Sequence, residues 1–336
     1  MPRRIAQIAE GTEIANRRAL ITGIAGQDGS YLAELLLGKG YRVSGVVERD
    51  PSIARPNLSE IESQVTLHAI DLTSRADVEE LIDSERPDEI YHLAAPSVVP
   101  ASWDDPVATL DFMSGSVVRL LDAIADHADS TRFFHAASSE IFRGTGDAPQ
   151  NELSPPRPTS PYGVGKLAGH ALVNSYRAQH DVFATSGILY NHESPRRPPS
   201  FVTRKIVNGA VAIKLGESDE LLLGDTTAQR DWGCATDYVQ AMWLMLQADE
   251  PDDYVIATGR LRSVQNLVDT VFELLGLDAA EYVKQDPALL RKGDEALLQG
   301  DPAKAQAQLG WHNETSFEEM LQQMIDNELA RRGAPA

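Results

Sequence analysis

Four residues in the middle of the chain have the types and spacing needed for acid–base chemistry on an alcohol. Ser138 and Glu140 follow an apolar run, and Tyr162 and Lys166 come about twenty residues later. Four residues apart in a helix, Tyr162 and Lys166 lie on one face, a turn from each other. We expect the Lys166 ammonium to lower the pKa of the phenol, so that Tyr162 takes a proton from a substrate hydroxyl near neutral pH. Glu140 adds a second acid–base group, which predicts oxidation together with the movement of another proton.

Elements in the first half of the chain must position these groups. Apolar, strand-like runs at residues 18–23, 42–47, 65–70, 89–94, 132–137 and 183–189 alternate with helical patterns at 30–38, 75–84, 110–127 and 161–180. Alternation at this spacing predicts right-handed crossovers and an α/β fold with a Rossmann-type, doubly wound parallel sheet. Tyr162 and Lys166 then lie on the helix between the last two strands.

The alternation stops after Asn191. The proline-rich run 192–200 predicts a loop, and short, irregular segments follow at 203–215, 221–223, 236–247, 254–257, 263–275 and 316–332. We therefore expect an N-terminal extension (1–17), a dinucleotide-binding domain (18–190) and a smaller, irregular, mainly substrate-binding lobe (191–336), with some of its chain returning to the sheet.

A glycine loop follows the first strand. Gly23, Gly26 and Gly29 are spaced G-x-x-G-x-x-G, which is typical of short-chain dehydrogenase/reductase proteins. They permit a tight turn and let backbone N–H groups approach a diphosphate at a helix N-terminus. Leu93 and Ala94 end the fourth strand in a run of small residues, which either a cofactor or a closely packed helix requires.

The end of the second strand should determine cofactor choice. An acidic group such as Glu48 can hold the ribose hydroxyls of NAD, whereas an arginine such as Arg49 favours the 2′-phosphate of NADP. This chain has both side by side, and both could also be solvent-exposed loop charges. Asp71 and Leu72, just after the third strand, are placed to meet the adenine, although an aspartate there also caps helices.

Composition restricts the class of protein. The chain has 336 residues, enough for one large domain or a large and a small one. Its net charge of −20 argues against nonspecific binding to nucleic acid or to an anionic membrane. The single Cys234 excludes an intramolecular disulfide framework, and we expect no metal site. A basic start followed by a polar stretch lacks an apolar signal core, so a cytoplasmic location is expected.

Several further motifs resemble the GDP-mannose 4,6-dehydratases, a family of sugar-nucleotide enzymes in the extended short-chain dehydrogenase/reductase group. They extend from about residue 19 to residue 329. Besides the glycine loop and the four acid–base residues, they comprise Leu189-Tyr-Asn-His-Glu-Ser-Pro-Arg-Arg197, Phe201-Val-Thr-Arg-Lys-Ile206, Arg230-Asp-Trp-Gly233, Asp237-Tyr-Val-Gln-Ala-Met-Trp243, Gly300-Asp-Pro-Ala-Lys304, Leu309-Gly-Trp311 and Thr315-Ser-Phe-Glu-Glu319.

The resemblance implies a mechanism and a binding site. Tyr162, supported by Lys166, would accept the C4 hydroxyl proton while the C4 hydride goes to the nicotinamide. Glu140 would then remove the C5 proton and assist loss of water from C6, before the hydride returns to C6, giving GDP-4-dehydro-6-deoxymannose. Ser138 would hydrogen-bond the sugar O4. The implied cofactor-binding residues are Gly23, Gly26, Gln27, Asp28, Gly29, Arg49, Asp71, Leu72, Leu93, Ala94, Ser97, Tyr162, Lys166, Leu189, His192 and Arg197; the implied substrate-binding residues are Ser97, Ser139, Glu140, Asn191, Lys205 and Arg230.

The chain departs from the family pattern at several positions. Residues 48–51 are Glu-Arg-Asp-Pro where the family has Arg-Arg-Ser-Ser, a segment that binds the 2′-phosphate and joins subunits. NADP is favoured by the resemblance, NAD is the alternative because of Glu48, and a homodimer or homotetramer is expected. Arg143 stands where a small residue is normal, and prolines replace glycine in the loop 196–199.

Two other readings remain open. One is a different sugar-nucleotide enzyme of the same group, such as a reductase, an epimerase or a decarboxylase. Glu140 argues against a plain 4-epimerase, which needs no C5 base, and the block from Leu189 to Arg197 argues against a decarboxylase. The other is a nucleotide-sensing binding protein, which would not need the four acid–base residues.

Overall fold

The computed structural model describes residues 16–50, 52–127, 130–290 and 296–334. Of the expected N-terminal extension, only Asn16 and Arg17 fall within these ranges. In the described part of the chain, no helix combines the length and the apolarity needed to cross a membrane.

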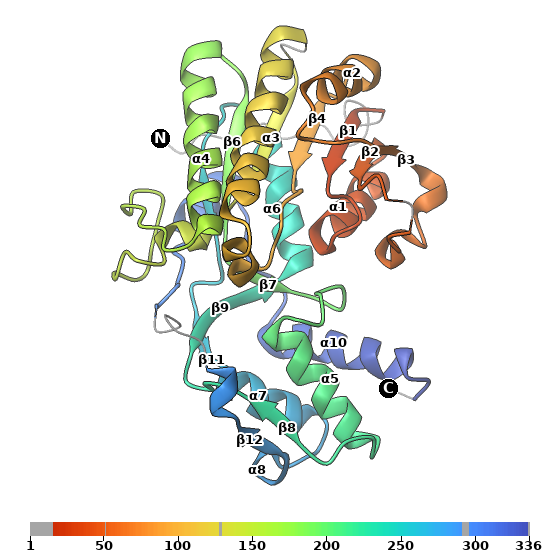
Figure 1. The fold of residues 1–336 in the computed structure, drawn as a ribbon, viewed down its shortest axis with the longest axis vertical. Helices are drawn as coiled ribbons and strands as arrows, with labels where there is room; N and C mark the ends of the chain where they lie inside the picture. The colour runs from red at the N-terminus through yellow and green to blue at the C-terminus, as the bar shows by residue number, and fades with distance from the viewer. Residues whose placement is uncertain (1–15, 51, 128–129, 291–295, 335–336) are drawn as a thin grey trace.

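A seven-stranded parallel sheet forms the centre of the larger part of the molecule (Figure 1). The strand order β10-β6-β5-β4-β1-β2-β3 reverses direction at β1, which is characteristic of a doubly wound sheet and confirms the predicted Rossmann-type α/β class. Most strands are buried on both faces, as expected for parallel strands covered by helices. The strands are β1 (Arg18–Thr22), β2 (Arg42–Val47), β3 (Val65–Ala69), β4 (Glu89–His92), β5 (Arg132–Ser138), β6 (Ala184–Leu189) and β10 (Tyr254–Ile256).

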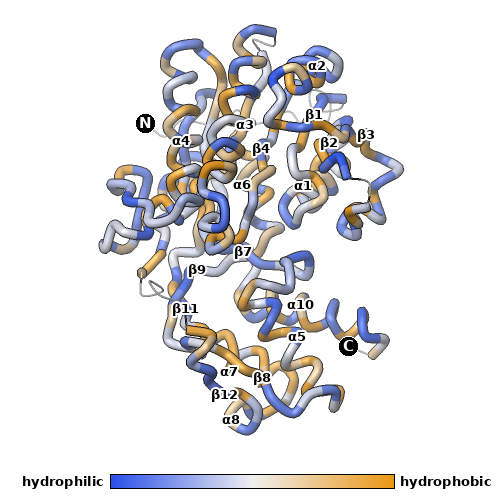
Figure 2. The backbone as a smooth tube through the Cα atoms, viewed as in Figure 1, coloured by the Kyte–Doolittle hydropathy of each residue, from blue (hydrophilic) through white to orange (hydrophobic). Residues whose placement is uncertain are grey.

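Helices cover both faces of this sheet. α2 (Arg75–Glu85), α3 (Pro106–His127) and α4 (Pro161–His180) pack side by side on one face. α1 (Gln27–Gly38), α6 (Ala235–Gln247) and α9 (Ala303–Leu309) contribute to the core on the other. Figure 2 shows alternating hydrophobic and hydrophilic stretches along α3 and α4, as expected for helices with one buried face. α6, α9 and β10 come from the segment after residue 191, so part of that segment packs on or joins the sheet.

Local sequence signals explain where α4 begins. Ser160 is its N-cap residue, and the side chain accepts a hydrogen bond from the Gly163 N–H at 3.1 Å. Pro161 occupies the first helical turn, where its missing N–H has no partner to lose. Tyr162 and Lys166 are therefore held in the first two turns.

The smaller part of the molecule lies beyond the carboxyl ends of the strands (Figure 1). Its helices are α5 (Val202–Lys214), α7 (Val264–Leu274), α8 (Ala279–Tyr282) and α10 (Phe317–Arg331), and its strands are β7 (Asn191–Glu193), β8 (Leu221–Leu223), β9 (Gln229–Cys234), β11 (Leu261–Ser263) and β12 (Val283–Gln285). The prediction of a loop over 192–200 was wrong at its start. β7 pairs with β9, with Asn191 opposite Trp232, and this pairing with a distant segment leaves no local sequence signal.

Candidate active site

The four predicted acid–base residues meet at the carboxyl end of β5. The strand ends at Ser138, and Glu140 lies in the next 3₁₀ turn, η4 (Ser139–Phe142). The Ser138 Oγ accepts a hydrogen bond of 3.3 Å from the Glu140 N–H, which caps the turn. The first turns of α4, which carry Tyr162 and Lys166, pack against η4.

The pKa of Tyr162 differs from the sequence-based prediction. Burial raises the pKa of Tyr162 to about 12, while its hydrogen bond with Ser138 acts in the opposite direction. The Lys166 Nζ lies 5.8 Å from the centroid of the tyrosine ring and donates a hydrogen bond of 2.8 Å to the Ala136 carbonyl oxygen. The expected lowering of the Tyr162 pKa is therefore wrong here, because desolvation of the phenol outweighs the more distant ammonium.

Lys166 is itself strongly affected by burial. Its side chain lies within the fold, with only 6% of the residue exposed. Burial lowers the pKa of Lys166 to about 8, and the negative charge of Asp28 opposes this change. Lys166 thus keeps its positive charge at neutral pH but loses it at mildly alkaline pH.

Glu140 forms an ion pair with Arg143. The guanidinium donates two hydrogen bonds, from Nε to Oε2 at 2.7 Å and from Nη2 to Oε1 at 3.0 Å. The two side chains are only 12% and 16% exposed. Sequence reasoning recorded Arg143 as a departure from the family but missed this pairing, which the i, i+3 spacing could have suggested.

The glycine loop fits a dinucleotide diphosphate. Gly23 has a φ of +73°, which only glycine adopts without strain. A Cβ on Gly29 would lie 2.3 Å from the Gly23 carbonyl oxygen, so the turn closes tightly onto α1. Gly26 is the N-cap residue of α1 and carries no side chain to cover the first N–H groups. These donors and the helix dipole favour an anionic group at this position.

A polar network joins the glycine loop to β7, across more than 160 residues of sequence. The His192 Nε2 lies 2.9 Å from the Asp28 Oδ2, and the Nδ1 lies 2.7 Å from the Tyr190 carbonyl oxygen. Burial acts against both charges, but the pair lowers the pKa of Asp28 and raises that of His192. The Gln27 side chain donates to the His192 carbonyl oxygen at 3.2 Å and accepts from the Ser194 Oγ at 2.7 Å. The raised pKa and the acceptor oxygens near both ring nitrogens favour the protonated form of His192 beside the predicted cofactor loop.

Arg197 approaches the same region from the segment after β7. Its guanidinium lies 3.0 Å from Glu193 and 3.7 Å from the centroid of the Phe201 ring. Its positive charge opposes the rise in the Tyr162 pKa, which places it within electrostatic reach of the phenol. Glu193 is 1% exposed and also accepts a hydrogen bond of 2.5 Å from Thr203. Sequence reasoning missed Glu193 as the anchor of Arg197, although its i, i+4 spacing was a signal.

The residues predicted to bind the adenosine half of the cofactor make contacts within the protein. Arg49 lies just beyond β2 and forms an ion pair with Asp77 in the first turn of α2. Asp71 accepts hydrogen bonds from the N–H and Oγ1 of Thr73 and therefore forms a turn. Leu72 is 4% exposed and packs in the core, so its side chain has little surface for an adenine.

Other predicted cofactor residues lie along the carboxyl edge of the sheet. The N–H groups of Leu93 and Ala94 both donate hydrogen bonds of 3.1 Å to the Thr22 Oγ1, which draws this strand end against β1. Leu189 is the register partner of Ser138 on the neighbouring strand. Ser97 is exposed in the segment after β4.

The predicted substrate residues are more dispersed. Ser139 is 3% exposed within η4, beside Glu140. Asn191 begins β7, and Arg230 lies on the paired strand β9, where its guanidinium donates to the Gln229 carbonyl oxygen at 2.6 Å. Lys205 is exposed on α5. The pairing of β7 with β9 brings the strands of Asn191 and Arg230 together.

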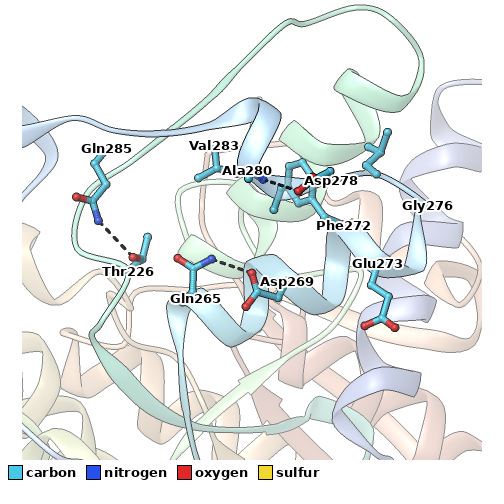
Figure 3. A pocket seen from close by; sticks show the side chains of 12 residues that line it. Thr226, Gln265, Asp269, Phe272, Glu273, Gly276, Asp278, Ala280, Val283 and Gln285 are labelled. Carbon is cyan, nitrogen blue, oxygen red and sulfur yellow. Dashed lines mark hydrogen bonds between the residues drawn. The ribbon is translucent and has the colours of Figure 1, made fainter.

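A cavity of about 770 Å³ lies elsewhere, between α7, α8 and β12 (Figure 3). Several of its polar side chains are already paired: Gln265 with Asp269, and Gln285 with Thr226. No predicted site residue lines it, so we do not place the chemistry there. Within the described ranges, no group of three or more histidine, cysteine, aspartate or glutamate residues is arranged to hold a metal ion.

Known structures share this fold. UDP-glucose 4-epimerase of Thermotoga maritima, determined with UDP-glucose, superposes with a TM-score of 0.82 at 25% identity, covering 94% of this chain and 99% of that chain. UDP-glucose 4-epimerase of Thermus thermophilus, determined with NAD, superposes with a TM-score of 0.80 at 26% identity, with the same two coverages.

Closer similarity is found among dehydratases. GDP-mannose 4,6 dehydratase 2 of Arabidopsis thaliana is 44% identical over 339 residues, covering 96% of this chain and 91% of that protein. GDP-mannose 4,6 dehydratase of Homo sapiens is 41% identical over 342 residues, covering 93% of this chain and 92% of that protein. The family model described as GDP-mannose 4,6 dehydratase matches residues 20–324. With its near-complete coverage and its assembled acid–base residues, this chain belongs to the GDP-mannose 4,6-dehydratase family.

Proposed function

We propose that the chain is a hydro-lyase that converts GDP-mannose to GDP-4-dehydro-6-deoxymannose with a nicotinamide dinucleotide as cofactor. The observation that carries the proposal is the convergence of Glu140 with Ser138, Tyr162 and Lys166 in a member of this family. An enzyme that only oxidised an alcohol would need no additional carboxylate beside the tyrosine.

The first step is oxidation at C4. An oxidised nicotinamide supplies the hydride acceptor for C4 and, once reduced, the hydride donor for C6. Tyr162 accepts the C4 hydroxyl proton as its phenolate, and Ser138 orients the sugar oxygen. The positive charges of Lys166 and Arg197 offset part of the penalty of burying the phenolate.

The second step is loss of water. The C4 ketone makes the C5 hydrogen acidic, and Glu140 accepts this proton while the C5–H electrons move towards the ketone oxygen. Glu140 then returns the proton to the C6 hydroxyl as the C6–O bond breaks, which releases water and leaves a C5–C6 double bond. Hydride addition at C6 and addition of a solvent proton at C5 complete the product, while Tyr162 returns to solvent the proton it took from the C4 hydroxyl, so that neither protons nor the cofactor change on balance.

An epimerase is the second candidate, because the two superposed structures are UDP-glucose 4-epimerases. Their identities of 25–26% are well below the 41–44% of the dehydratases. A 4-epimerase would also leave Glu140 without a role. We therefore favour the dehydratase over an epimerase, a reductase, a decarboxylase or a nucleotide sensor.

Product mass tests this proposal. The purified protein with GDP-mannose and NADP or NAD should form a product lighter by one water, without net reduction of the cofactor. Glu140→Gln should retain substrate binding and stop water loss, whereas Glu79→Gln, a matched change at an exposed pair with Arg75, should remain active. No reaction with GDP-mannose, but turnover of a UDP- or dTDP-sugar, would refute the substrate assignment.

For the cofactor, we propose that both dinucleotides bind, with NADP favoured. Arg49 is 60% exposed, and exposed ion pairs such as that with Asp77 are weak, so a 2′-phosphate can displace the carboxylate. Glu48, the residue after β2, would hold the ribose hydroxyls of NAD. Arg49→Ala should lower, and Glu48→Gln should raise, the NADP-to-NAD ratio of kcat/KM. An unchanged ratio in both variants would contradict this assignment.

We further propose that the protein acts in the cytoplasm as a homodimer or homotetramer, without a nucleic-acid or membrane partner. The net charge of −20 supports the last part, because polyanions would be repelled. We retain the division into residues 1–17, 18–190 and 191–336 as part of this proposal, with α6, α9 and β10 packing on the first domain. Light scattering on the purified protein measures the assembly, and a monomer would contradict it.

A further inference from the structure

We propose that Arg143 is a positioning residue that latches Glu140 in the free enzyme and opposes its acceptance of the C5 proton. The proposal rests on the proposed function, because it concerns the elimination step of that reaction. It assigns a role to the position at which this chain departs from the small residue expected in the family.

The latch is formed by two hydrogen bonds. One guanidinium binds both carboxylate oxygens of Glu140, at 2.7 and 3.0 Å. This two-point contact of opposite charges is among the stronger pairings that side chains form. With side chains only 16% and 12% exposed, solvent screens the pair much less than it screens an exposed one.

The backbone around the latch is anchored. The Arg157 N–H donates to the Ile141 carbonyl oxygen at 2.7 Å, and the Gly144 N–H donates to the Arg157 carbonyl oxygen at 2.8 Å. A Cβ added to Gly163 would lie 2.9 Å from the Glu140 carbonyl oxygen, so α4 presses closely on the same turn. Release of Glu140 is therefore achieved by rotation of the Arg143 side chain, not by movement of η4.

The latch acts on one half of the reaction. Glu140 can accept the C5 proton on a lone pair that Arg143 does not use, but it then loses the charge that holds the guanidinium, so Arg143 is released only as the two charge-assisted contacts are lost, and these contacts oppose the transfer. Oxidation at C4 uses Tyr162 and Ser138, neither of which depends on this release. Arg143 therefore slows elimination relative to C4 oxidation.

Transient kinetics with GDP-mannose separate the two halves. The ultraviolet absorbance of reduced nicotinamide should rise with C4 oxidation and fall when hydride returns to C6, and deuterium uptake at C5 from heavy water reports the loss and replacement of the C5 proton. In Arg143→Ala, the rise should change by less than about twofold, while the fall and the C5 exchange should both become about tenfold faster, the effect of losing a charge-assisted hydrogen bond. Arg143→Lys, with a single-point contact, should lie between Arg143→Ala and the wild type, and KM should not change.

The matched control is Arg75→Ala, which removes an arginine from the exposed pair with Glu79 on α2 and should leave both phases unchanged. Equal rates of the rise and of the fall in the wild type and in Arg143→Ala, or a parallel loss of both phases, would overturn the proposal. If Arg143→Ala does not fold, unchanged phases in Arg143→Lys would also overturn it. Failure of the wild type to dehydrate GDP-mannose would instead refute the proposed function, so the two failures are distinguishable.

Discussion

Replacing the buried Lys166 by methionine should stabilise the folded protein while abolishing its activity. Burial lowers the pKa of Lys166 from 10.5 to about 8, so at neutral pH the fold holds an ammonium in an unfavourable environment. The difference, at about 1.4 kcal/mol for each pKa unit, corresponds to about 3 kcal/mol. Methionine fills a similar volume but loses the hydrogen bond to the Ala136 carbonyl oxygen, worth about 1 kcal/mol. The free energy of unfolding of Lys166→Met should therefore exceed that of the wild type by about 2 kcal/mol at pH 7.

The sign of the pH dependence provides a second check. Below the folded-state pKa of about 8, Lys166 is protonated in both states and the full penalty is present. Between there and the unfolded-state value of 10.5, the unfolded chain binds more protons, so the stability of the wild type rises with pH. The advantage of Lys166→Met should consequently shrink towards zero by about pH 9.5.

Urea unfolding followed by tryptophan fluorescence, at pH 7 and again near pH 9.5, measures both effects. Lys214→Met is the matched control, because exposed Lys214 also donates to a backbone carbonyl, that of Leu275 at 2.8 Å. The control should gain no stability. A Lys166→Met variant less stable than the wild type at pH 7, or one whose advantage is independent of pH, would refute the reasoning.

Two further predictions concern the cofactor loop. Asp28→Asn should lower the pKa of His192, measurable by NMR titration of its ring, and should reduce the free energy of unfolding near pH 6 by about 2 kcal/mol, the value of a hydrogen bond between charged groups. The contribution of Asp28 to the free energy of unfolding is present above pH 3.8 and is lost as pH falls through its lowered folded-state pKa. The contribution of His192 is present below pH 6.5 and is lost as pH rises through its raised folded-state pKa. An unchanged His192 titration would contradict the ion pair. Gly29→Ala should weaken dinucleotide binding, measured by calorimetry, by about tenfold or more, because its Cβ would collide with the Gly23 carbonyl oxygen. Gly38→Ala, where a Cβ meets nothing within 4 Å, should bind normally, and equal affinities in the two variants would contradict this account of the loop.

Much of the sheet was predictable because its signals are local. Buried parallel strands are continuous apolar runs, and the helices between them carry their own caps, such as Ser160 before α4. Strands β7, β9, β11 and β12 were missed because their existence depends on pairing, of β7 and β11 with β9 and of β12 with β8. α9 was also missed, and its seven residues offer little periodicity to read.

The grouping of the four acid–base residues was predictable, but their electrostatics were not. Spacing and motifs identified Ser138, Glu140, Tyr162 and Lys166, which the fold brings together. The lowered pKa expected for Tyr162 was wrong because desolvation depends on every group packed around the phenol. Motifs likewise suggested Arg49 as a phosphate ligand, but not its ion pair with Asp77.

The sequence by itself determined the alternation of strands and helices, the tight glycine turn and the acid–base residue types, since each depends on neighbours within a few positions. Only the tertiary structure decided which distant polar groups face one another: His192 with Asp28, and Lys166 with the Ala136 carbonyl oxygen. Side-chain direction and the exclusion of water set those interactions, and both arise only when distant segments pack. The predicted acid–base residues Tyr162 and Lys166 therefore acquire the shifts in their pKa values from the fold.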